Sequence, residues 1–431
     1  MRAASHSLAA FSAIVAAPIA AAALAARPDW REGFGERLGW LPLTAGAGGS
    51  FGAGAPLWIH GASVGEVVAA SRLVEELLGA GESVVVSTTT TSGRAVMRHR
   101  FPHVPCHLAP LDHAWTAAAA LRRVAPRMLV LVETELWPVW IAEADRRGVP
   151  VVVVSGRLSD RAFPRYRRLA PLVRRMVGRI SAVGARTDVD ARRFVALGAD
   201  PRRVSVTGDL KLEPPADPPP LAADLDAALG DVPLVVAGST HPGEDEALLD
   251  ALGALEASGA EAALLLAPRH PHSSEVLADR VRASGRQLLL RSALADERLE
   301  SGGVLLLDTL GELAAVYARA RLVFVGGTLV PVGGHNLLEP VYAGCPVFFG
   351  PHVENASHAA SILERSGAGQ RVSDPAALAA ALVHAFHSIE ERERCAAAGR
   401  AVLEAHRGAV RRSLALIRSH LLETADGARP S

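Results

Sequence analysis

Short apolar runs alternate with longer amphipathic stretches along most of this chain. In the first half, such runs predict strands at residues 57–60, 83–87, 128–132, 149–155 and 180–183. In the second half, they predict strands at residues 233–237, 262–267, 304–307, 322–325 and 346–349. Strands that are apolar on both faces and separated by helices are typical of a parallel sheet covered on both sides. We therefore expect an α/β protein with two doubly wound, Rossmann-like domains.

A proline-rich stretch separates these two regions. Residues 213–232 include the run EPPADPPP, which breaks the periodicity and predicts a linker. The expected domains are then residues 28–212 and 233–431. Because ligands of such sheets bind at the carboxyl ends of the strands, we expect the active site in a cleft between the two domains.

Residues 1–27 form a separate N-terminal segment. Residues 8–26 are uncharged, although eleven of these nineteen are alanine and Pro18 interrupts them. Nineteen uncharged residues are about what a helix needs to cross a bilayer, but a cleaved signal peptide or an interfacial helix is also compatible with the pattern. Arginine occurs once before residues 8–26, at position 2, and at positions 27, 31 and 37 after them. The positive-inside rule then places the rest of the chain in the cytoplasm, which favours an anchor or an interfacial helix.

Composition excludes several other classes of protein. The 45 basic and 45 acidic residues give zero net charge, which argues against binding nucleic acid by bulk electrostatics. Three widely spaced cysteines fit neither a disulfide framework nor a zinc cluster. Lys211 is the single lysine, and Asn336 and Asn355 are the only asparagines, so the positions of these rare residues are informative.

Positive charge is concentrated in residues 157–179, which we call the arginine-rich segment. It holds eight arginines and the single acid Asp160. A charge run is usually a solvated face, but this local imbalance also suits an anionic lipid surface or a phosphorylated acceptor. Arg165, Arg167 and Arg168 are the candidate contacts.

Carboxylates follow two predicted strands of the first domain. Glu66 lies in the sequence His60-Gly61-Ala62-Ser63-Val64-Gly65-Glu66, which leads from the first strand into a helix. Two interpretations stand about equal: Glu66 complements the helix dipole, or it is a functional acid beside the cleft. The glycine spacing does not match the dinucleotide fingerprint. Glu133 and Glu135 follow the strand at 128–132 and are poor core residues, so we expect them in the cleft, unless one of them caps the next helix.

The second domain has three candidate binding loops. Residues 238–241 precede an expected helix start, with Ser239 and Thr240 as caps, amides that suit a phosphate and His241 as a neighbour. Arg269 lies in a proline-flanked loop and offers a guanidinium fork for phosphate or carboxylate.

The third of these loops, residues 326–340, contains four glycines, including Gly333 and Gly334. Asn336 and Glu339 are expected three positions apart on one helical face. This combination suits a phosphate at a helix N-terminus and a carboxylate that accepts hydrogen bonds from ribose hydroxyls.

Six motifs in this order resemble those of the 3-deoxy-D-manno-octulosonic acid (Kdo) transferases of lipopolysaccharide synthesis. They are SVGE at 63–66, ETELWP at 133–138, GDLK at 208–211, GSTH at 238–241, PRHP at 268–271 and GGHNLLEP at 333–340. The segment RPDWREGFGERLG at 27–39 is similar as well, so the resemblance extends from about residue 27 to the end of the chain.

The resemblance implies a GT-B glycosyltransferase, with an acceptor-binding first domain and a donor-binding second domain that face each other across a cleft. It implies an inverting reaction, without metal or cofactor, that moves Kdo from CMP-Kdo to a lipid A precursor, lipid IVA. The enzyme would work at the cytoplasmic face of the inner membrane, with no nucleic-acid partner. The alternatives are a UDP-sugar transferase or epimerase of the same architecture, and a two-domain sugar-binding protein without catalysis.

The resemblance also assigns roles to single residues. It makes Glu66 the general base and has Glu133 and Glu135 orient the sugar or the acceptor. It assigns the CMP phosphate and the leaving-group charge to Lys211, His241 and Arg269, and the nucleotide to the glycine-rich loop, through Gly333, Gly334, Asn336 and Glu339.

Overall fold

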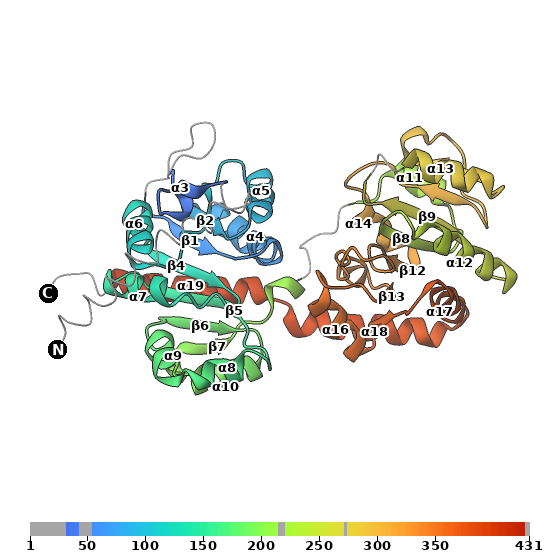
Figure 1. The fold of residues 1–431 in the computed structure, drawn as a ribbon. Helices are drawn as coiled ribbons and strands as arrows, with labels where there is room; N and C mark the ends of the chain where they lie inside the picture. The colour runs from blue at the N-terminus through green and yellow to red at the C-terminus, as the bar shows by residue number, and fades with distance from the viewer. Residues whose placement is uncertain (1–31, 43–53, 214–219, 271–273, 427–431) are drawn as a thin grey trace. The chain divides into compact units, whose positions relative to one another are not determined.

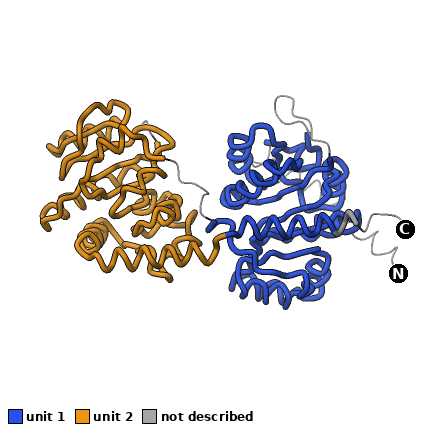
Figure 2. Tube along the Cα trace, turned by 180° about the vertical axis from the view of Figure 1, so that it is seen from behind, with its two compact units in different colours: residues 1–213, 408–431 blue, residues 214–407 orange. Residues whose placement is uncertain are grey.

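The computed structural model describes residues 32–42, 54–213, 220–270 and 274–426. Figure 2 shows that they form two compact units. Unit 1 contains the described residues up to Glu213 and those from Gly408 onward, and unit 2 contains the described residues between them, up to Arg407. Each unit is built on a parallel sheet with helices packed against it (Figure 1).

The sheet of unit 1 has the strand order β3-β2-β1-β4-β5-β6-β7, and its neighbouring strands are parallel. Its strands are β1 (Leu57–His60), β2 (Val84–Thr88), β3 (Cys106–Leu108), β4 (Met128–Val132), β5 (Val151–Gly156), β6 (Ala182–Ala185) and β7 (Val204–Val206). Leu57 pairs with Val84 on one side and with Met128 on the other. The chain therefore reverses its direction of winding between β1 and β4, which is where ligands bind in doubly wound sheets.

The helices of unit 1 cover both faces of this sheet. They are α3 (Phe34–Arg37), α4 (Val64–Gly79), α5 (Thr91–Arg100), α6 (Ala114–Val124), α7 (Pro138–Arg146), α8 (Phe163–Arg168), α9 (Ala170–Val177), α10 (Asp188–Ala196) and α19 (Ala409–Asp426), with a 3-10 turn at Leu210–Leu212. One buried cluster joins the sheet to α6, α7, α9 and α10, and the other joins it to α4, α5 and α19. Fully buried strands explain the long apolar runs of the sequence.

The helix α19 corrects the expected domain boundary, because it belongs to unit 1 rather than to the second domain. Ala409, Leu414 and Ile417 are buried in the cluster that contains α4. The Glu213 carboxylate caps the start of the helix by accepting hydrogen bonds from the amides of Gly408 (3.1 Å) and Val410 (3.3 Å). Figure 1 shows α19, in red, lying against the blue and green elements of unit 1.

Unit 2 repeats the arrangement, with parallel strands in the order β10-β11-β9-β8-β12-β13-β14. The strands are β8 (Leu234–Thr240), β9 (Ala263–Pro268), β10 (Leu288–Leu290), β11 (Val304–Leu306), β12 (Ala320–Val325), β13 (Val347–Phe349) and β14 (Gly369–Arg371). The helices are α11 (Ala223–Leu229), α12 (Asp245–Ala257), α13 (Ser274–Ala283), α14 (Leu313–Val316), α15 (Glu339–Tyr342), α16 (Ser357–Ser366), α17 (Pro375–His387) and α18 (Ile389–His406). Here the winding reverses between β8 and β12.

Part of the predicted linker is folded into unit 2. The predicted linker, residues 213–232, contains the helix α11, whose Leu225 and Leu229 are buried. The predicted anchor, residues 8–26, lies outside the described residues. Among the helices that the structure does describe, none combines the length and the apolar character needed to cross a bilayer.

Candidate active site

The predicted residues of unit 1 converge at the point where the winding of the sheet reverses. Glu66 follows β1, and Glu133 and Glu135 follow β4, the strand paired with β1. We call these three residues the carboxylate cluster. Their grouping follows from topology, because the carboxyl ends of neighbouring parallel strands meet at one edge of the sheet.

Glu66 caps α4 and is held firmly by doing so. Its Oε2 accepts hydrogen bonds from the amides of Ala62 (2.6 Å) and Ser63 (3.4 Å), and its Oε1 accepts one from Ser63 Oγ (3.1 Å). Ser63 Oγ in turn accepts from the Glu66 amide at 3.4 Å, which completes a capping box. This capping box places Glu66 in the first turn of α4, a position that suits an acid beside the helix dipole, and it fixes where the carboxylate lies.

The surroundings of Glu66 also favour its protonated form. Burial raises the pKa of Glu66, and the negative charges of Glu133 and Glu135 raise it further. The hydrogen bond from Ala62 and the charge of Lys211 act in the opposite direction. A carboxyl group that is half-buried beside two others has the raised pKa that is typical of acid–base groups in active sites.

Glu133 binds two cations of unit 1. Its Oε1 forms an ion pair with Lys211 Nζ and lies 3.3 Å from Arg186 Nη2. Arg186 Nε also lies 3.1 Å from the buried carboxylate of Asp209. Glu133 has a φ of 63°, a strained conformation for a residue with a side chain and one that is common at functional sites.

The structure places Lys211 beside Glu133. The resemblance assigns Lys211, together with His241 and Arg269 of unit 2, to the CMP phosphate. In the structure Lys211 lies in unit 1, as the expected first domain implies, and it pairs with the carboxylate cluster. A contact of Lys211 with the donor phosphate stays a prediction. Arg186 and Asp209 were not anticipated, because their ion pairs join residues far apart in the sequence.

Glu135 lies against an aromatic group. Its Oε2 accepts a 2.6 Å hydrogen bond from Trp137 Nε1 and lies 3.7 Å from His60 Nε2. The rings of Trp137 and Trp140 stack with centroids 5.8 Å apart, and both pack in the core of unit 1. Neither glutamate caps α7, because Asp112 accepts hydrogen bonds from the amides of Val139 and Trp140, both at 3.0 Å.

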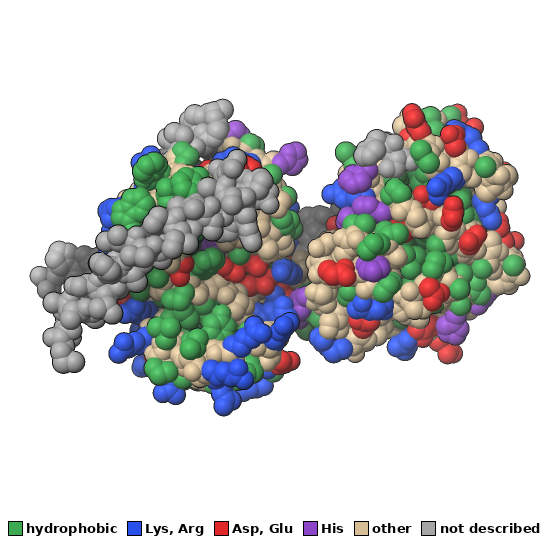
Figure 3. All heavy atoms as spheres, in the orientation of Figure 1, with side chains coloured by type: hydrophobic (Ala, Val, Ile, Leu, Met, Phe, Trp, Pro, Cys, Tyr) green, Lys and Arg blue, Asp and Glu red, His purple; other side chains and the backbone are tan. Residues whose placement is uncertain are grey.

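Helix α8, which is part of the arginine-rich segment, carries three exposed arginines. Arg165, Arg167 and Arg168 are exposed on α8, and none of them forms an ion pair within the described part of the chain. In Figure 3, basic side chains gather over the region that α8 and α9 occupy in Figure 1. Burial raises the pKa of the phenol of Tyr166, on the same helix, and the nearby charge of Glu135 raises it further.

In unit 2, two of the predicted loops meet where the winding of the sheet reverses. His241 follows β8, His335 lies in the loop after β12, and their Nε2 atoms are 2.7 Å apart. One ring therefore donates and the other accepts. Burial lowers the pKa of His335 to about 4, with His241 and Arg269 acting in the same direction, and burial also lowers the pKa of His241.

Glu244 holds these loops together and was not predicted. Its carboxylate is fully buried and accepts from four amides. The donors are His241 (2.9 Å), Gly327 (2.8 Å), Thr328 (3.0 Å) and Leu329 (3.0 Å). Ser239 and Thr240, the expected caps, are instead part of β8, and α12 begins only at Asp245. The feature of the sequence that could have identified Glu244 is an acidic residue directly after the turn Pro242-Gly243.

The glycine pair of the β12 loop makes room for Asn355. Gly333 and Gly334 have φ values of 102° and 81°, and a Cβ on Gly333 would lie 2.5 Å from Asn355 Nδ2. Asn355 also donates from its amide to Gly333 O (2.8 Å) and from Nδ2 to Val332 O (3.1 Å). Both asparagines of the chain therefore serve this loop, although the sequence singled out Asn336 alone.

Asn336 and Glu339 contact each other in a different geometry from the one expected. Asn336 precedes α15 rather than lying in it, donates to Glu339 Oε1 at 3.1 Å and accepts from the Leu338 amide at 3.1 Å. Burial raises the pKa of Glu339, and the hydrogen bond from Asn336 opposes this shift. Arg269 is exposed, and its amide donates to Thr240 O at 2.9 Å, which ties the β9 loop to the β8 loop.

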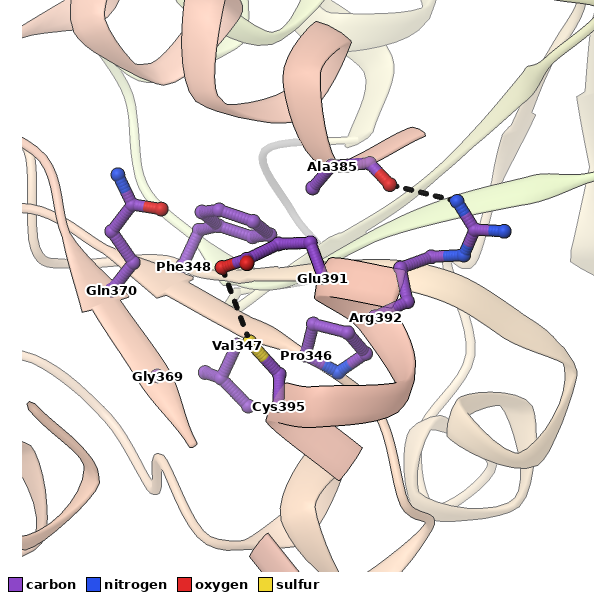
Figure 4. Close-up of a pocket in the computed structure, with 9 residues that line it drawn as sticks. All are labelled: Pro346, Val347, Phe348, Gly369, Gln370, Ala385, Glu391, Arg392 and Cys395. Carbon is purple, nitrogen blue, oxygen red and sulfur yellow. Dashed lines mark hydrogen bonds between the residues drawn. The ribbon is translucent and has the colours of Figure 1, made fainter. Parts of the chain in front are cut away.

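A small pocket elsewhere in unit 2 contains none of the predicted residues (Figure 4). It lies between β13, β14, α17 and α18, and Cys395 Sγ lies 3.7 Å from Glu391 Oε1 on its wall. The described residues contain no group of histidine, cysteine or acidic side chains arranged to hold a metal ion.

Two Rossmann-like units, each built on a parallel sheet with polar loops at the point where its winding reverses, are the architecture found in GT-B glycosyltransferases. A solved structure of this kind, a putative UDP-N-acetylglucosamine 2-epimerase from Listeria monocytogenes, matches with a TM-score of 0.53 and 14% identity. The match covers 86% of this chain and 98% of that one, and it supports the fold alone. The arrangement of the two domains across a cleft stays a prediction.

Comparisons of sequence identify the family. The family described as 3-deoxy-D-manno-octulosonic-acid transferase (kdotransferase) matches residues 32–213. A 3-deoxy-D-manno-octulosonic acid transferase of Haemophilus influenzae is 34% identical over 406 residues, which are 91% of this chain and 92% of the relative. The protein of the same name from Bordetella pertussis is 35% identical, over 84% of this chain and 86% of its own. The chain belongs to the Kdo transferase family, and it is a glycosyltransferase.

Proposed function

We propose that this enzyme transfers Kdo from CMP-Kdo to a hydroxyl of a lipid A precursor, lipid IVA, with Glu66 as the general base. The observation that carries the proposal is the carboxylate cluster, in which Glu66 is fixed by a capping box and has a raised pKa. A carboxylate with a raised pKa is a stronger base than an ordinary glutamate, and this suits the removal of a proton from a hydroxyl group.

The proposed reaction is a single displacement. The acceptor oxygen forms a bond to the anomeric carbon of Kdo while its proton passes to Glu66. The bond between that carbon and the phosphate oxygen of CMP breaks, and CMP leaves with the electron pair. Attack from the side opposite to the leaving group inverts the anomeric configuration. The ion pair of Lys211 with Glu133 supports the proposal, because it fixes a second carboxylate beside the base.

The donor is proposed to bind to unit 2. Its β8 and β12 loops are joined through Glu244 and through the contact between His241 and His335. Arg269, exposed in the adjacent loop, offers a cation for the CMP phosphate, and Asn336 and Glu339 offer polar groups for the nucleotide. A guanidinium can stabilise the leaving phosphate, which is the role that a metal ion has in other transferases, so we propose transfer without a metal.

The acceptor side is supported by the surface around α8. Arg165, Arg167 and Arg168 offer positive charge, and the neighbouring Leu169 and Leu172 are 58% and 60% exposed. A phosphorylated lipid at an anionic membrane surface matches both properties. We therefore propose that the enzyme works on the cytoplasmic side of the inner membrane, with residues 8–26 as an anchor or an interfacial helix.

Mass spectrometry of the product tests this function. The enzyme is incubated with freshly generated CMP-Kdo and tetraacylated lipid A precursor, with and without EDTA. We expect the acceptor to gain the mass of one or more Kdo residues in both cases, and the spectrum reports how many. No gain with CMP-Kdo but a gain with a UDP-sugar would contradict the proposed donor. Loss of transfer in EDTA that added metal restores would contradict the metal-free reaction.

A further inference from the structure

A chain of buried polar side chains leads from the sheet of unit 1 to Glu135. Trp58, on β1, donates from its indole Nε1 to Ser87 Oγ at 2.8 Å. Ser87 Oγ lies 2.9 Å from Nδ1 of His60, the last residue of β1. All three side chains are at most 1% exposed. Polar groups that are buried this deeply persist when they have partners, so the direction of each hydrogen bond is constrained.

These contacts fix the tautomer of His60. An indole N–H can only donate, so Ser87 Oγ accepts from Trp58. The hydroxyl proton of Ser87 then needs an acceptor, and the one that the structure provides is His60 Nδ1. A neutral imidazole that accepts at Nδ1 carries its proton on Nε2.

The Nε2–H of His60 faces one member of the carboxylate cluster. His60 Nε2 lies 3.7 Å from Glu135 Oε2, which is the charged group within ion-pair distance of this ring among the described residues. No described atom accepts a hydrogen bond from Nε2, although it is fully buried. The ring itself is held against Trp140, with centroids 4.9 Å apart. The distance is too long for a hydrogen bond, but such bonds often shorten when a substrate binds.

We propose that His60 is a positioning residue for Kdo transfer, whose Nε2–H holds the Glu135 carboxylate in place beside Glu66 when the acceptor is bound. Trp137 Nε1 already donates to the same oxygen at 2.6 Å, so the two groups together limit how Glu135 can turn. The expected kinetic effect rests on the proposed function, in which Glu66 is the general base and the charge of Glu135 raises its pKa. The tautomer of His60 does not depend on that function.

Two amide substitutions separate the two ring nitrogens. The side-chain nitrogen of glutamine reaches the position of Nε2, whereas that of asparagine reaches only the position of Nδ1. We expect His60→Asn to lower kcat by about 10- to 100-fold, the usual loss for a group that orients a functional side chain, with little change in the KM for CMP-Kdo. His60→Gln should retain most of the wild-type rate.

The pH profile separates positioning from mere structural support. If Glu135 is less firmly held in His60→Asn, its charge raises the pKa of Glu66 less, so the acid limb of kcat/KM moves to lower pH. Equal rates and identical acid limbs in the two variants and the wild type would overturn the proposal, as would equal losses in both variants without any shift of the limb.

A measurement on the unmodified protein completes the test. In ¹⁵N-histidine-labelled full-length enzyme, the His60 ring, assigned by its absence from the His60→Gln spectrum, should show a proton on Nε2 and none on Nδ1 at neutral pH. A proton on Nδ1 would overturn the inference without affecting the assignment of the protein as a Kdo transferase. Failure of the transfer assay with a proton on Nε2 would instead count against the proposed function.

Discussion

At the scale of single residues, Lys211 shows how closely the site of unit 1 is packed. Its ammonium group pairs with Glu133, and its Cε lies 3.6 Å from the point where a Cβ on Gly65 would be. A compact ammonium fits this position, whereas a planar guanidinium is broader and requires more hydrogen-bond acceptors in its plane. In a chain that otherwise uses arginine for every cation, the lysine is therefore explained by its surroundings.

Lys211→Arg should accordingly impair catalysis. We expect kcat/KM to fall roughly tenfold or more, which corresponds to about 1.4 kcal/mol of transition-state stabilisation. Steady-state kinetics measure this, with thermal unfolding to check the fold. Arg202→Lys is the matched control, because Arg202 is exposed and pairs only with Asp200 in the described structure. Wild-type kinetics for Lys211→Arg would show that the lysine has no special role.

The acidic residues that the sequence singled out in unit 1 share one property, which is that they follow long apolar strands. Glu66, Glu133 and Glu135 are near neighbours because β1 and β4 pair, and the apolar runs predicted those strands. Glu244 and His60 could not be predicted in the same way. Their roles depend on hydrogen bonds to residues up to 85 positions away, which no local pattern specifies.

At the scale of elements, the central strands were predictable and the edges of the sheets were not. The four strands that the sequence missed are β3, β7, β10 and β14, and each of them is a three-residue strand at the edge of a sheet. A strand of three residues gives an apolar run too short to distinguish it from the neighbouring helices and loops, and edge strands are commonly also partly exposed. In β7 and β14, for example, two of the three residues are exposed.

The helix α8 is the element to test for membrane binding. Replacing Arg165, Arg167 and Arg168 with serine should weaken binding to anionic vesicles, by about 1 kcal/mol for each arginine that lies near the surface. The wild-type binding should fall with added salt, and the variant should depend less on salt. A co-sedimentation assay measures both effects. The control replaces three exposed arginines of unit 2 that have acidic partners, namely Arg282, Arg394 and Arg407. Equal binding by the two triple variants would leave the arginine-rich segment as a solvated face.

The loops after β8 and β12 should depend on Glu244 for their conformation. Glu244→Gln replaces one of the two acceptor oxygens with a donor, which leaves buried amides without partners. We expect the free energy of unfolding to fall by about 1–3 kcal/mol and the affinity for CMP to fall with it. Urea unfolding and calorimetry measure these quantities. Glu246→Gln is the control, since its side chain is 80% exposed in the first turn of α12, which begins directly after Glu244. Unchanged stability and CMP affinity in Glu244→Gln would mean that the loops keep their shape without this carboxylate.

At the scale of the whole molecule, the return of the chain to unit 1 was the feature least accessible from sequence. The amphipathic pattern of α19 predicts a helix with one buried face, but it does not specify which sheet covers that face. The contacts of α19 with α4, β5 and β6 make that choice. Unit 1 therefore needs residues from both ends of the described chain, and residues 28–212 alone would lack part of its core.

Acid should destabilise the protein through histidines that are buried in the neutral form. Burial lowers the pKa of His107 from 6.5 to about 4, and neither of its ring nitrogens has a hydrogen-bond partner among the described residues. Because the unfolded chain binds this proton more readily, His107 adds stability above the unfolded pKa, and this contribution is lost as the pH falls toward 4. As the pH is lowered, the melting temperature of His107→Leu should therefore fall less steeply than that of the wild type. The control His103→Leu replaces an exposed histidine and should leave the dependence of the melting temperature on pH unchanged. If His107→Leu showed the same pH dependence as the wild type, this account would be contradicted.

The central claim is that Glu66 removes the proton from the acceptor hydroxyl. Glu66→Gln keeps the size of the side chain and removes the base, and it should lower kcat by about 100-fold or more while CMP binding to unit 2 stays nearly intact. In the wild type, activity should rise with pH through the raised pKa of Glu66. The decisive measurement is the rate at which lipid A precursor gains Kdo from CMP-Kdo, followed by mass spectrometry for Glu66→Gln beside the wild type. Near-complete loss of transfer with intact CMP binding is the predicted result, and wild-type turnover in the variant would contradict the mechanism.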